Sequence, residues 1–449
     1  MYNLVEVEKL GKPAVALCNV GFVQDAVASA AVRGVPGLRI VPEEIPSECT
    51  SREEIHSGVD RVFDQILRAL LDPPTDRESS PEAQGLQEEG VEGVVYRGTL
   101  EEVNRYFYRM GWTDGLPIVP PTPRAVEEML RGTDLEPDHV VAHLPPRMGR
   151  ATVEKIAVNA VMAGALPTHL PVVIAAVEAL LDPRTWFGTY QVSTGSWAPF
   201  VVVNGPVRRD VGLNCSSGAL SPGNMANAAI GRALSLVIRN IGGARPGIED
   251  MGVLGNPGKW SMVAGEWEEL SPWPPLHVDE GLSPERSAVS VIFVNTFVQV
   301  LGYGSEPEDL VRSLTYNIPP TKKDATAALL LPPHLARILA QAGWQKQDVV
   351  DFVWRYTQVP ACQHPDWVRA RRLGERHTRI GAVDPHVAVQ VLGRKEVIRV
   401  VVVGGPGNVM GIVLGGGIMP AQWVTRQVQL PRTWGRLVTR YRGVVPRVR

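Results

Sequence analysis

The chain has 449 residues, a length that roughly two to four domains of about 100–200 residues would fill. Apolar residues make up 44% and charged residues 20%, so a buried core can form and wholesale disorder is excluded. The 45 basic and 47 acidic residues give a net charge of −2, which excludes nucleic acid or anionic membrane as a partner attracted by charge. No apolar run has the length of a leader or a membrane span, so we expect a soluble cytoplasmic protein.

The N-terminal part alternates short apolar runs with helical patterns. Taken in order, the elements that we expect are a strand at 12–17, a helix from 23, a strand at 38–41 and a helix over 59–70. This predicts a small β-α-β-α domain over residues 1–71. Residues 72–93 are polar, acidic and rich in Pro, Gly and Ser, which is typical of a linker.

Residues 94–449 predict a larger α/β domain, with a possible division into two subdomains near 310–380. Capping signals at Thr122-Pro123 and Thr152 indicate helix starts. The further elements that we expect are helices at 101–110, 123–130, 153–163, 170–181 and 224–239 and strands at 200–203, 289–294 and 397–403. Two of the buried strands end in similar Gly-Pro turns, which fits either an internal duplication or two ordinary strands.

The most informative stretch is the loop at 214–227, between the strand at 200–203 and the helix at 224–239. A loop that feeds a helix start presents free backbone N–H groups and the positive end of the helix dipole, which suits an anion. If Cys215 faced this field, its thiol pKa would fall and it could act as a nucleophile. The alternative is an inert cysteine in an ordinary loop. The candidate binding residues in the stretch are Asn214, Ser216, Gly223, Asn224 and Asn227.

Two further segments could complete a pocket. In the helix at 153–163, Lys155 and Asn159 share one face, and Arg150 precedes it. Asn159 is either a buried amide bonded to a nearby carbonyl or a group that faces the site. The turn at 111–122 carries Trp112 as a candidate wall and Asp114 as a candidate acid or base, although the local pattern favours a structural turn that Asp114 itself caps. Arg232, two turns into the next helix, is a candidate anion ligand.

Several familiar sites are missing from the sequence. The glycine pattern at 405–411 does not match a dinucleotide fingerprint and there is no P-loop, so we predict neither NAD nor ATP and leave the cofactor unknown. None of the four cysteines form C-x-x-C, and the histidines show no zinc spacing, so we predict no metal site from sequence. The stretch with Trp260, Trp267 and Trp273 and its acidic residues could shape a substrate mouth or a subunit interface. We favour the interface, in a homo-oligomer or a larger complex.

The segment ALCNVGFVQDAVASAAVRGVPGLRIVPEEIPSECT, within roughly residues 12–70, resembles the UGSC family. That resemblance implies a thiol–disulfide oxidoreductase and makes Cys18 and Cys49 candidate redox residues, but the tetrapeptide that names the family is missing here. Over roughly 100–300, segments such as GWTDGLPIVPPT and LSPGNMANAAIGRALSLVIRNIGG resemble a family of bacterial proteins associated with that domain.

From these features we expect an enzyme that acts on a small anionic organic molecule, by lyase, thiol-transfer or reduction chemistry. Cys215 would be the thiol and Asp114 an acid or base, while Arg150, Lys155 and Arg232 would hold the anion. Two alternatives stay open: a non-catalytic or binding subunit of a larger assembly, and a metal-dependent hydrolase or lyase.

Overall fold

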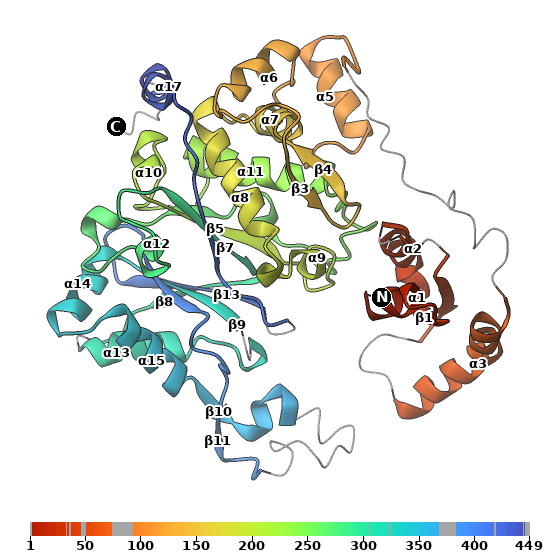
Figure 1. Cartoon of the computed structure of the whole chain (residues 1–449). Coiled ribbons are helices and arrows are strands. Elements are labelled where there is room, and N and C mark those ends of the chain that lie inside the picture. The colour runs from red at the N-terminus through yellow and green to blue at the C-terminus, as the bar shows by residue number, and fades with distance from the viewer. Residues whose placement is uncertain are drawn as a thin grey trace. The chain divides into compact units, whose positions relative to one another are not determined.

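The computed structural model describes residues 2–32, 34–35, 37–45, 51–73, 93–304, 306–322, 325–367, 383–416, 419–442 and 444 (Figure 1). The chain forms two compact units. We call the first the small unit (1–97, 143–150 and 238–251) and the second the large unit (98–142, 151–237 and 252–449). The domain boundaries predicted from the sequence stay predictions.

The small unit contains the expected β-α-β-α order, preceded by a short helix that the sequence pattern did not reveal. Its elements are α1 (Tyr2–Lys9), β1 (Val15–Asn19), α2 (Val23–Val32), β2 (Arg39–Glu43) and α3 (Arg52–Leu71). Strands β1 and β2 are parallel, as a crossover through α2 requires. Ser51 and Glu54 form a reciprocal capping box that starts α3, which therefore begins seven residues before the apolar pattern at 59–70.

The large unit confirms the expected helices to within two residues at each end. They are α5 (Leu100–Arg109), α6 (Pro123–Leu130), α7 (Val153–Met162), α8 (Leu170–Leu180) and α11 (Met225–Asn240). Thr122 and Thr152 are the N-caps of α6 and α7, and each side-chain oxygen accepts a hydrogen bond from the backbone N–H three residues later. Local capping chemistry therefore sets these boundaries.

Two four-stranded sheets form the centre of the large unit. The first sheet has the order β14 (Val424–Gln427), β7 (Ala288–Val294), β5 (Ala198–Asn204) and β6 (Val263–Gly265). The second sheet has the order β12 (Ile398–Val402), β9 (Ala325–Leu331), β13 (Val409–Gly416) and β8 (Thr296–Leu301). Every residue of β5, β7 and β9 is buried, as expected of strands covered on both faces.

The two sheets pack face to face. Phe200 and Val202 of β5 point into one apolar cluster with Leu330 of β9 and Val401 of β12. The outer face of the second sheet packs on α13 (Pro307–Thr315), α14 (Pro333–Gln341) and α15 (Lys346–Tyr356), and the outer face of the first packs on α8. The large unit therefore has a helix–sheet–sheet–helix order (Figure 1).

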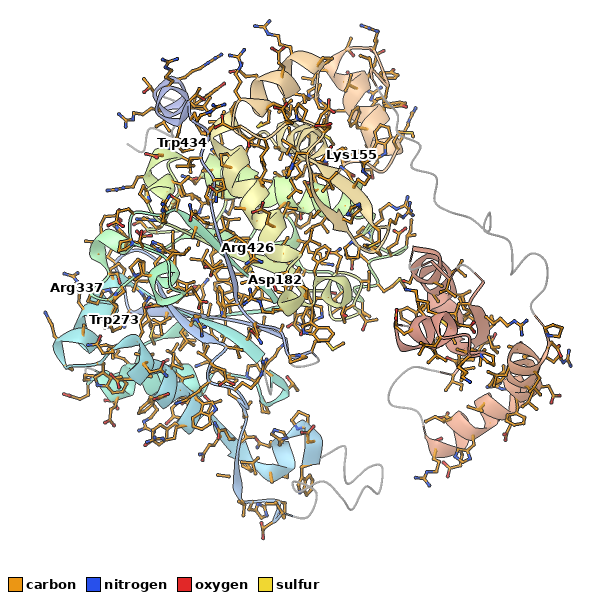
Figure 2. All side chains as sticks on the ribbon, viewed as in Figure 1. Lys155, Asp182, Trp273, Arg337, Arg426 and Trp434 are labelled. Atoms are coloured by element: carbon orange, nitrogen blue, oxygen red, sulfur yellow. The ribbon has the colours of Figure 1, made fainter. Side chains whose placement is uncertain are left out.

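The sheets repeat one another in topology. In each, an edge strand is parallel to its neighbour and the next two pairs are antiparallel: β6-β5-β7-β14 and β12-β9-β13-β8. In chain order, β5 to β8 form one half of this repeat, and β9 with β12 to β14 form the other. The last strand of each half, β8 or β14, pairs within the sheet that the other half forms. Arg426 of the exchanged strand β14 forms an ion pair of 2.6 Å with Asp182, which lies just after α8 (Figure 2). This pair links β14 to the end of α8. The equivalent of β5 is thus β9, so the similar Gly-Pro turns after β5 and β12 do not mark corresponding positions.

Candidate functional site

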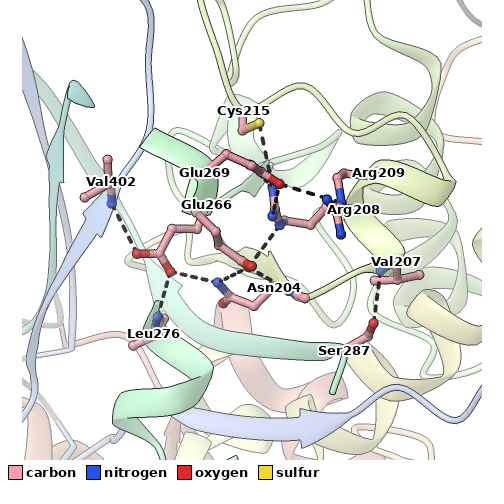
Figure 3. Close-up of polar contacts among 12 residues, drawn as sticks. Asn204, Val207, Arg208, Arg209, Cys215, Glu266, Glu269, Leu276, Ser287 and Val402 are labelled. Carbon is pink, nitrogen blue, oxygen red and sulfur yellow. Dashed lines mark hydrogen bonds and ion pairs between the residues drawn. The ribbon is translucent and has the colours of Figure 1, made fainter. Parts of the chain in front are cut away.

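Two parallel strands bring a cluster of buried polar and charged side chains of the large unit together. Strands β5 and β6 run in parallel, so their carboxyl ends meet at one edge of the sheet. Asn204 is the last residue of β5, and Glu266 directly follows β6. The Asn204 amide donates a hydrogen bond of 2.7 Å to Glu266 although the two residues lie 62 positions apart (Figure 3).

A sharp turn follows β5 and carries the chain into the short helix α10 (Val207–Asp210). Gly205 has a φ of +81°, and a Cβ there would collide with the Arg286 carbonyl. Only glycine fits this position without strain. The Val207 N–H donates to the Ser287 hydroxyl at 3.0 Å. The turn directs the Arg208 side chain back into the protein, where it is only 3% exposed.

Two glutamates neutralise the buried guanidinium. Arg208 Nε lies 2.9 Å from Glu268 and Nη2 lies 3.0 Å from Glu269 (Figure 3). Burial alone would lower the pKa of Arg208, but the two carboxylates outweigh it and raise that pKa. A buried charge needs this pairing, because an isolated one would be strongly destabilising. Glu268 also accepts the Gly205 N–H at 2.6 Å, so it belongs to the fixed framework.

The thiol of Cys215 borders this ion pair. Its sulfur lies 4.0 Å from Arg208 Nη1, and the residue is half-buried. Burial raises the pKa of the thiol, Glu269 raises it further, and the attraction of Arg208 does not compensate. A lowered pKa is expected only if the thiol faces the helix start, and the surroundings of Cys215 instead raise its pKa. The guanidinium that could stabilise a thiolate already holds two carboxylates.

Glu266 connects four separate segments of the chain. Its carboxylate is fully buried and accepts hydrogen bonds from Asn204, from the Leu276 N–H at 2.7 Å and from the Val402 N–H at 3.4 Å. Lys346 approaches the same carboxylate to 3.4 Å. The backbone adds two links, from Glu266 to the Val203 carbonyl and from Trp267 to the Val402 carbonyl. This segment therefore joins the end of β5 to the end of β12.

The amides of the loop at 214–227 hold the loop itself. Asn227 is buried and donates to the carbonyls of Asn214, Ala219 and Val263 at 3.0–3.1 Å. Asn224 caps α11 by accepting from the Asn227 N–H and also donates to the Gly212 carbonyl. Asn214 accepts from the Ser216 N–H at 2.9 Å. These side chains were predicted to bind substrate, but the contacts they make fix the backbone around Cys215. Gly223 has a φ of +127° at the turn before the helix.

Asp114 of the turn at 111–122 and Arg232 of α11 lie side by side, as a pocket built from these two segments would require. The two side chains form an ion pair with each other. The guanidinium makes a bidentate pair with the carboxylate at 2.8 and 2.9 Å and also donates to the Pro117 carbonyl at 2.8 Å. Each of the two charges is therefore compensated by the other, and the predicted roles of anion ligand and of acid or base stay predictions. The pair fastens the turn at 114–117 to α11.

The remaining predicted residues lie on other elements. Asn159 is buried and donates to the Lys155 carbonyl at 2.9 Å within α7, and Lys155 lies half-buried one turn earlier. Trp112 packs edge-on against Phe107, with 5.3 Å between ring centroids. Arg150 is exposed and belongs to the small unit.

The structure describes one of the two candidate redox cysteines, Cys18, which belongs to the small unit. Cys18 lies half-buried in β1, one residue before its end, with its sulfur 3.5 Å from the Asn19 carbonyl. Cys49 lies outside the described residues. Among the residues that the structure describes, no group of three or more His, Cys, Asp or Glu side chains is placed to hold a metal ion. No described helix is long and apolar enough to span a membrane.

Residues 1–72 match the model of the UGSC family. The match ends one residue after α3, so the UGSC domain covers the β-α-β-α segment of the small unit and none of the large unit. No curated protein and no solved structure matches the chain.

Sequence reasoning did not assemble the network at the end of β5. The pattern Asn204-Gly205-Pro206 was visible, as were the acids at 266, 268 and 269, but the acids were assigned to a Trp-rich interface. The missing signal is the parallel pairing of β5 with β6, which a single sequence does not reveal. The interface interpretation is wrong for Trp273, which is buried in the core and donates to the Trp344 carbonyl at 2.9 Å.

Proposed function

We propose that the large unit is an enzyme that acts on a small anionic organic molecule at the end of β5, with Cys215 as the reacting thiol. The observation that carries this proposal is the contact between a half-buried thiol and a buried arginine, at 4.0 Å from sulfur to Nη1. Arginine beside a thiol can hold the carboxylate or phosphate of a substrate while its electrophilic carbon faces the sulfur.

Glu269 occupies the position that the substrate anion would take. Its side chain is 41% exposed, whereas that of Glu268 is 17% exposed and tied to the turn after β5. Arg209, which is 68% exposed, also approaches Glu269, at 3.7 Å. An incoming carboxylate that displaced Glu269 would meet both arginines, while Glu268 would still compensate part of the charge. The substrate would thus exchange one carboxylate for another at no large electrostatic cost.

The protonation state of the thiol limits the chemistry. Because the pKa of Cys215 is raised, the free protein holds a neutral thiol at pH 7, and thiolate reactions such as thiol transfer or reduction would accelerate with pH. A neutral thiol can also donate a proton, as a lyase step would require.

A binding subunit without catalysis is the second candidate. It is favoured by the extent of internal compensation, since the two glutamates neutralise Arg208 and the amides around Cys215 are hydrogen-bonded within the loop. In that case the network would be a rigid support, and Cys215 would show no preference for anionic reagents.

Paired alkylating reagents distinguish the two candidates. Native protein is treated with iodoacetate or iodoacetamide. Both reagents alkylate a thiol through an iodomethylene carbon, but only iodoacetate carries a carboxylate. The extent of alkylation at each cysteine is quantified by mass spectrometry. We expect the iodoacetate-to-iodoacetamide ratio at Cys215 to exceed that at Cys362, which is also half-buried. Glu269→Gln should raise the ratio further, because it frees part of Arg208. Equal ratios at the two cysteines in both proteins would overturn the proposed anion site.

A further inference from the structure

A half-buried amine lies at the opposite end of β5 from Cys215. Lys322 is the last residue of the short helix η6 (Pro320–Lys322). Its ammonium nitrogen lies 5.3 Å from the centre of the ring of Trp197, the residue directly before β5. The amine donates a hydrogen bond to the Asn295 side-chain oxygen. Asn295 joins β7 to β8, and its own amide donates to the Gly195 carbonyl at 3.1 Å. Two loops and a helix end thus enclose this nitrogen.

The amine has no acidic partner within the described part of the chain. Elsewhere in the protein, Lys346 pairs with Glu266 and Asp279, and Lys395 pairs with Asp351 at 3.0 Å. Around Lys322 the contacts are a neutral amide oxygen and an aromatic face. A neutral hydrogen bond and a cation–π contact compensate a buried ammonium less well than a carboxylate does.

Burial therefore favours the neutral amine. It lowers the pKa of Lys322 to about 8. At pH 7 roughly a tenth of the side chain would then carry the lone pair that a nucleophile needs, against well under a thousandth of an ordinary lysine.

A second feature of the same corner points to a ligand. Trp197 is only 3% exposed, and its indole N–H has no hydrogen-bond partner among the described residues. Buried donors are nearly always satisfied, so the unused N–H of Trp197 beside this half-buried amine indicates that an acceptor belongs here. The site combines a planar apolar wall, one N–H donor and one amine.

We propose that Lys322 is a carbonyl-reactive site that binds a small aldehyde or ketone as an imine. The neutral nitrogen adds to the carbonyl carbon, and the carbinolamine loses water to give C=N, so no oxidant or reductant takes part. The ring of Trp197 would pack on the apolar part of the compound. Because β5 has seven residues, this site lies about 20 Å from the Cys215 end, and it stands independently of the function proposed there.

Reductive trapping tests this proposal on the full chain. The protein is incubated at pH 7 with benzaldehyde and sodium cyanoborohydride, and the benzylated lysines are mapped by mass spectrometry. The matched control is Lys395, which also lies over a tryptophan ring, at 5.8 Å, but pairs with a carboxylate and is more exposed. We expect Lys322 to react at least about tenfold faster than Lys395. Equal or slower labelling of Lys322 would overturn the proposal.

Two variants sharpen the test. Asn295→Asp would place a carboxylate beside the amine, and we expect it to slow labelling of Lys322 about tenfold while Lys395 is unchanged. Lys322→Arg should abolish the label at this position and keep the charge. If Asn295→Asp does not fold, the pH profile of wild-type labelling decides. A midpoint near 8 supports the site, and a midpoint near the ordinary lysine value of about 10.4 contradicts it.

Discussion

The two ends of β5 place reactive groups in similar surroundings with opposite results. At the carboxyl end, burial raises the pKa of the Cys215 thiol, and at the amino end burial lowers the pKa of the Lys322 amine. In both cases the low-dielectric interior favours the uncharged form. The uncharged form of a thiol is the unreactive one, whereas the uncharged form of an amine is the nucleophile.

The ends also differ in how charge is compensated. Arg208 is matched by two glutamates, and Glu266 is matched by an amide, two backbone N–H groups and Lys346. Within the described part of the chain, the contacts of Lys322 are the Asn295 oxygen and the Trp197 ring. A cationic side chain that pairs with a carboxylate, such as Arg208, therefore serves to hold the structure together. A cationic side chain without such a partner, such as Lys322 among the described residues, can lose its proton and react.

The largest expected effect comes from breaking the network at the carboxyl end. Glu266→Ala would leave the Lys346 ammonium without its buried partner and three N–H donors without an acceptor. We expect the free energy of unfolding in urea to fall by about 3–5 kcal/mol. Lys395→Ala, which removes an exposed pair, should cost less than about 1 kcal/mol. Similar losses in the two variants would show that the network contributes no more than a surface pair.

A smaller effect follows from removing one charge beside the thiol. Glu269 raises the pKa of Cys215, so Glu269→Gln should lower that pKa and increase the rate of iodoacetamide alkylation at pH 8 by about threefold to tenfold. Cys362 serves as the internal control. An unchanged rate at Cys215 would mean that burial alone sets its pKa.

The pH dependence of stability should differ in sign between the ends. The folded pKa of Lys322 lies below its unfolded value, so its protonation penalises the folded state, and stability should rise from about pH 8 towards 10. The folded pKa of Cys215 lies above its unfolded value, so its contribution is lost as pH rises through that range. Lys322→Met should flatten the rise and Cys215→Ala should steepen it, each by about 1 kcal/mol or less in chemical denaturation at pH 8 and 10.

The smallest expected effect concerns the exposed arginine. Arg209→Gln removes a pair of 3.7 Å at the surface, so we expect a change in unfolding free energy below about 0.5 kcal/mol. The iodoacetate preference of Cys215 should nevertheless fall by about twofold, because one positive charge no longer attracts the reagent. A loss of stability without a change in preference would contradict the role given to Arg209.

Local signals in the sequence predicted much of the secondary structure. Thr122-Pro123 and Thr152 mark helix starts through contacts over three residues, and the buried strand at 200–203 appears as β5. The same kind of reasoning could not place Asp114 against Arg232, 118 positions away, or Asn204 against Glu266. Those pairs depend on which strands and helices become neighbours. The similar turns after β5 and β12 even suggested the wrong correspondence between the two sheets.

The most direct test of the account is the order in which Cys215 and Lys322 lose their protons in one sample of the folded chain. Alkylation of Cys215 and benzylation of Lys322 are followed from pH 6 to 11 by peptide mapping. Free cysteine has a pKa of about 8.5 and free lysine about 10.4, so the thiol ordinarily titrates first. The structure predicts the inverted order, with Lys322 near 8 and Cys215 above its ordinary value. The ordinary order, thiol before amine, would contradict the claim that burial controls both ends of β5.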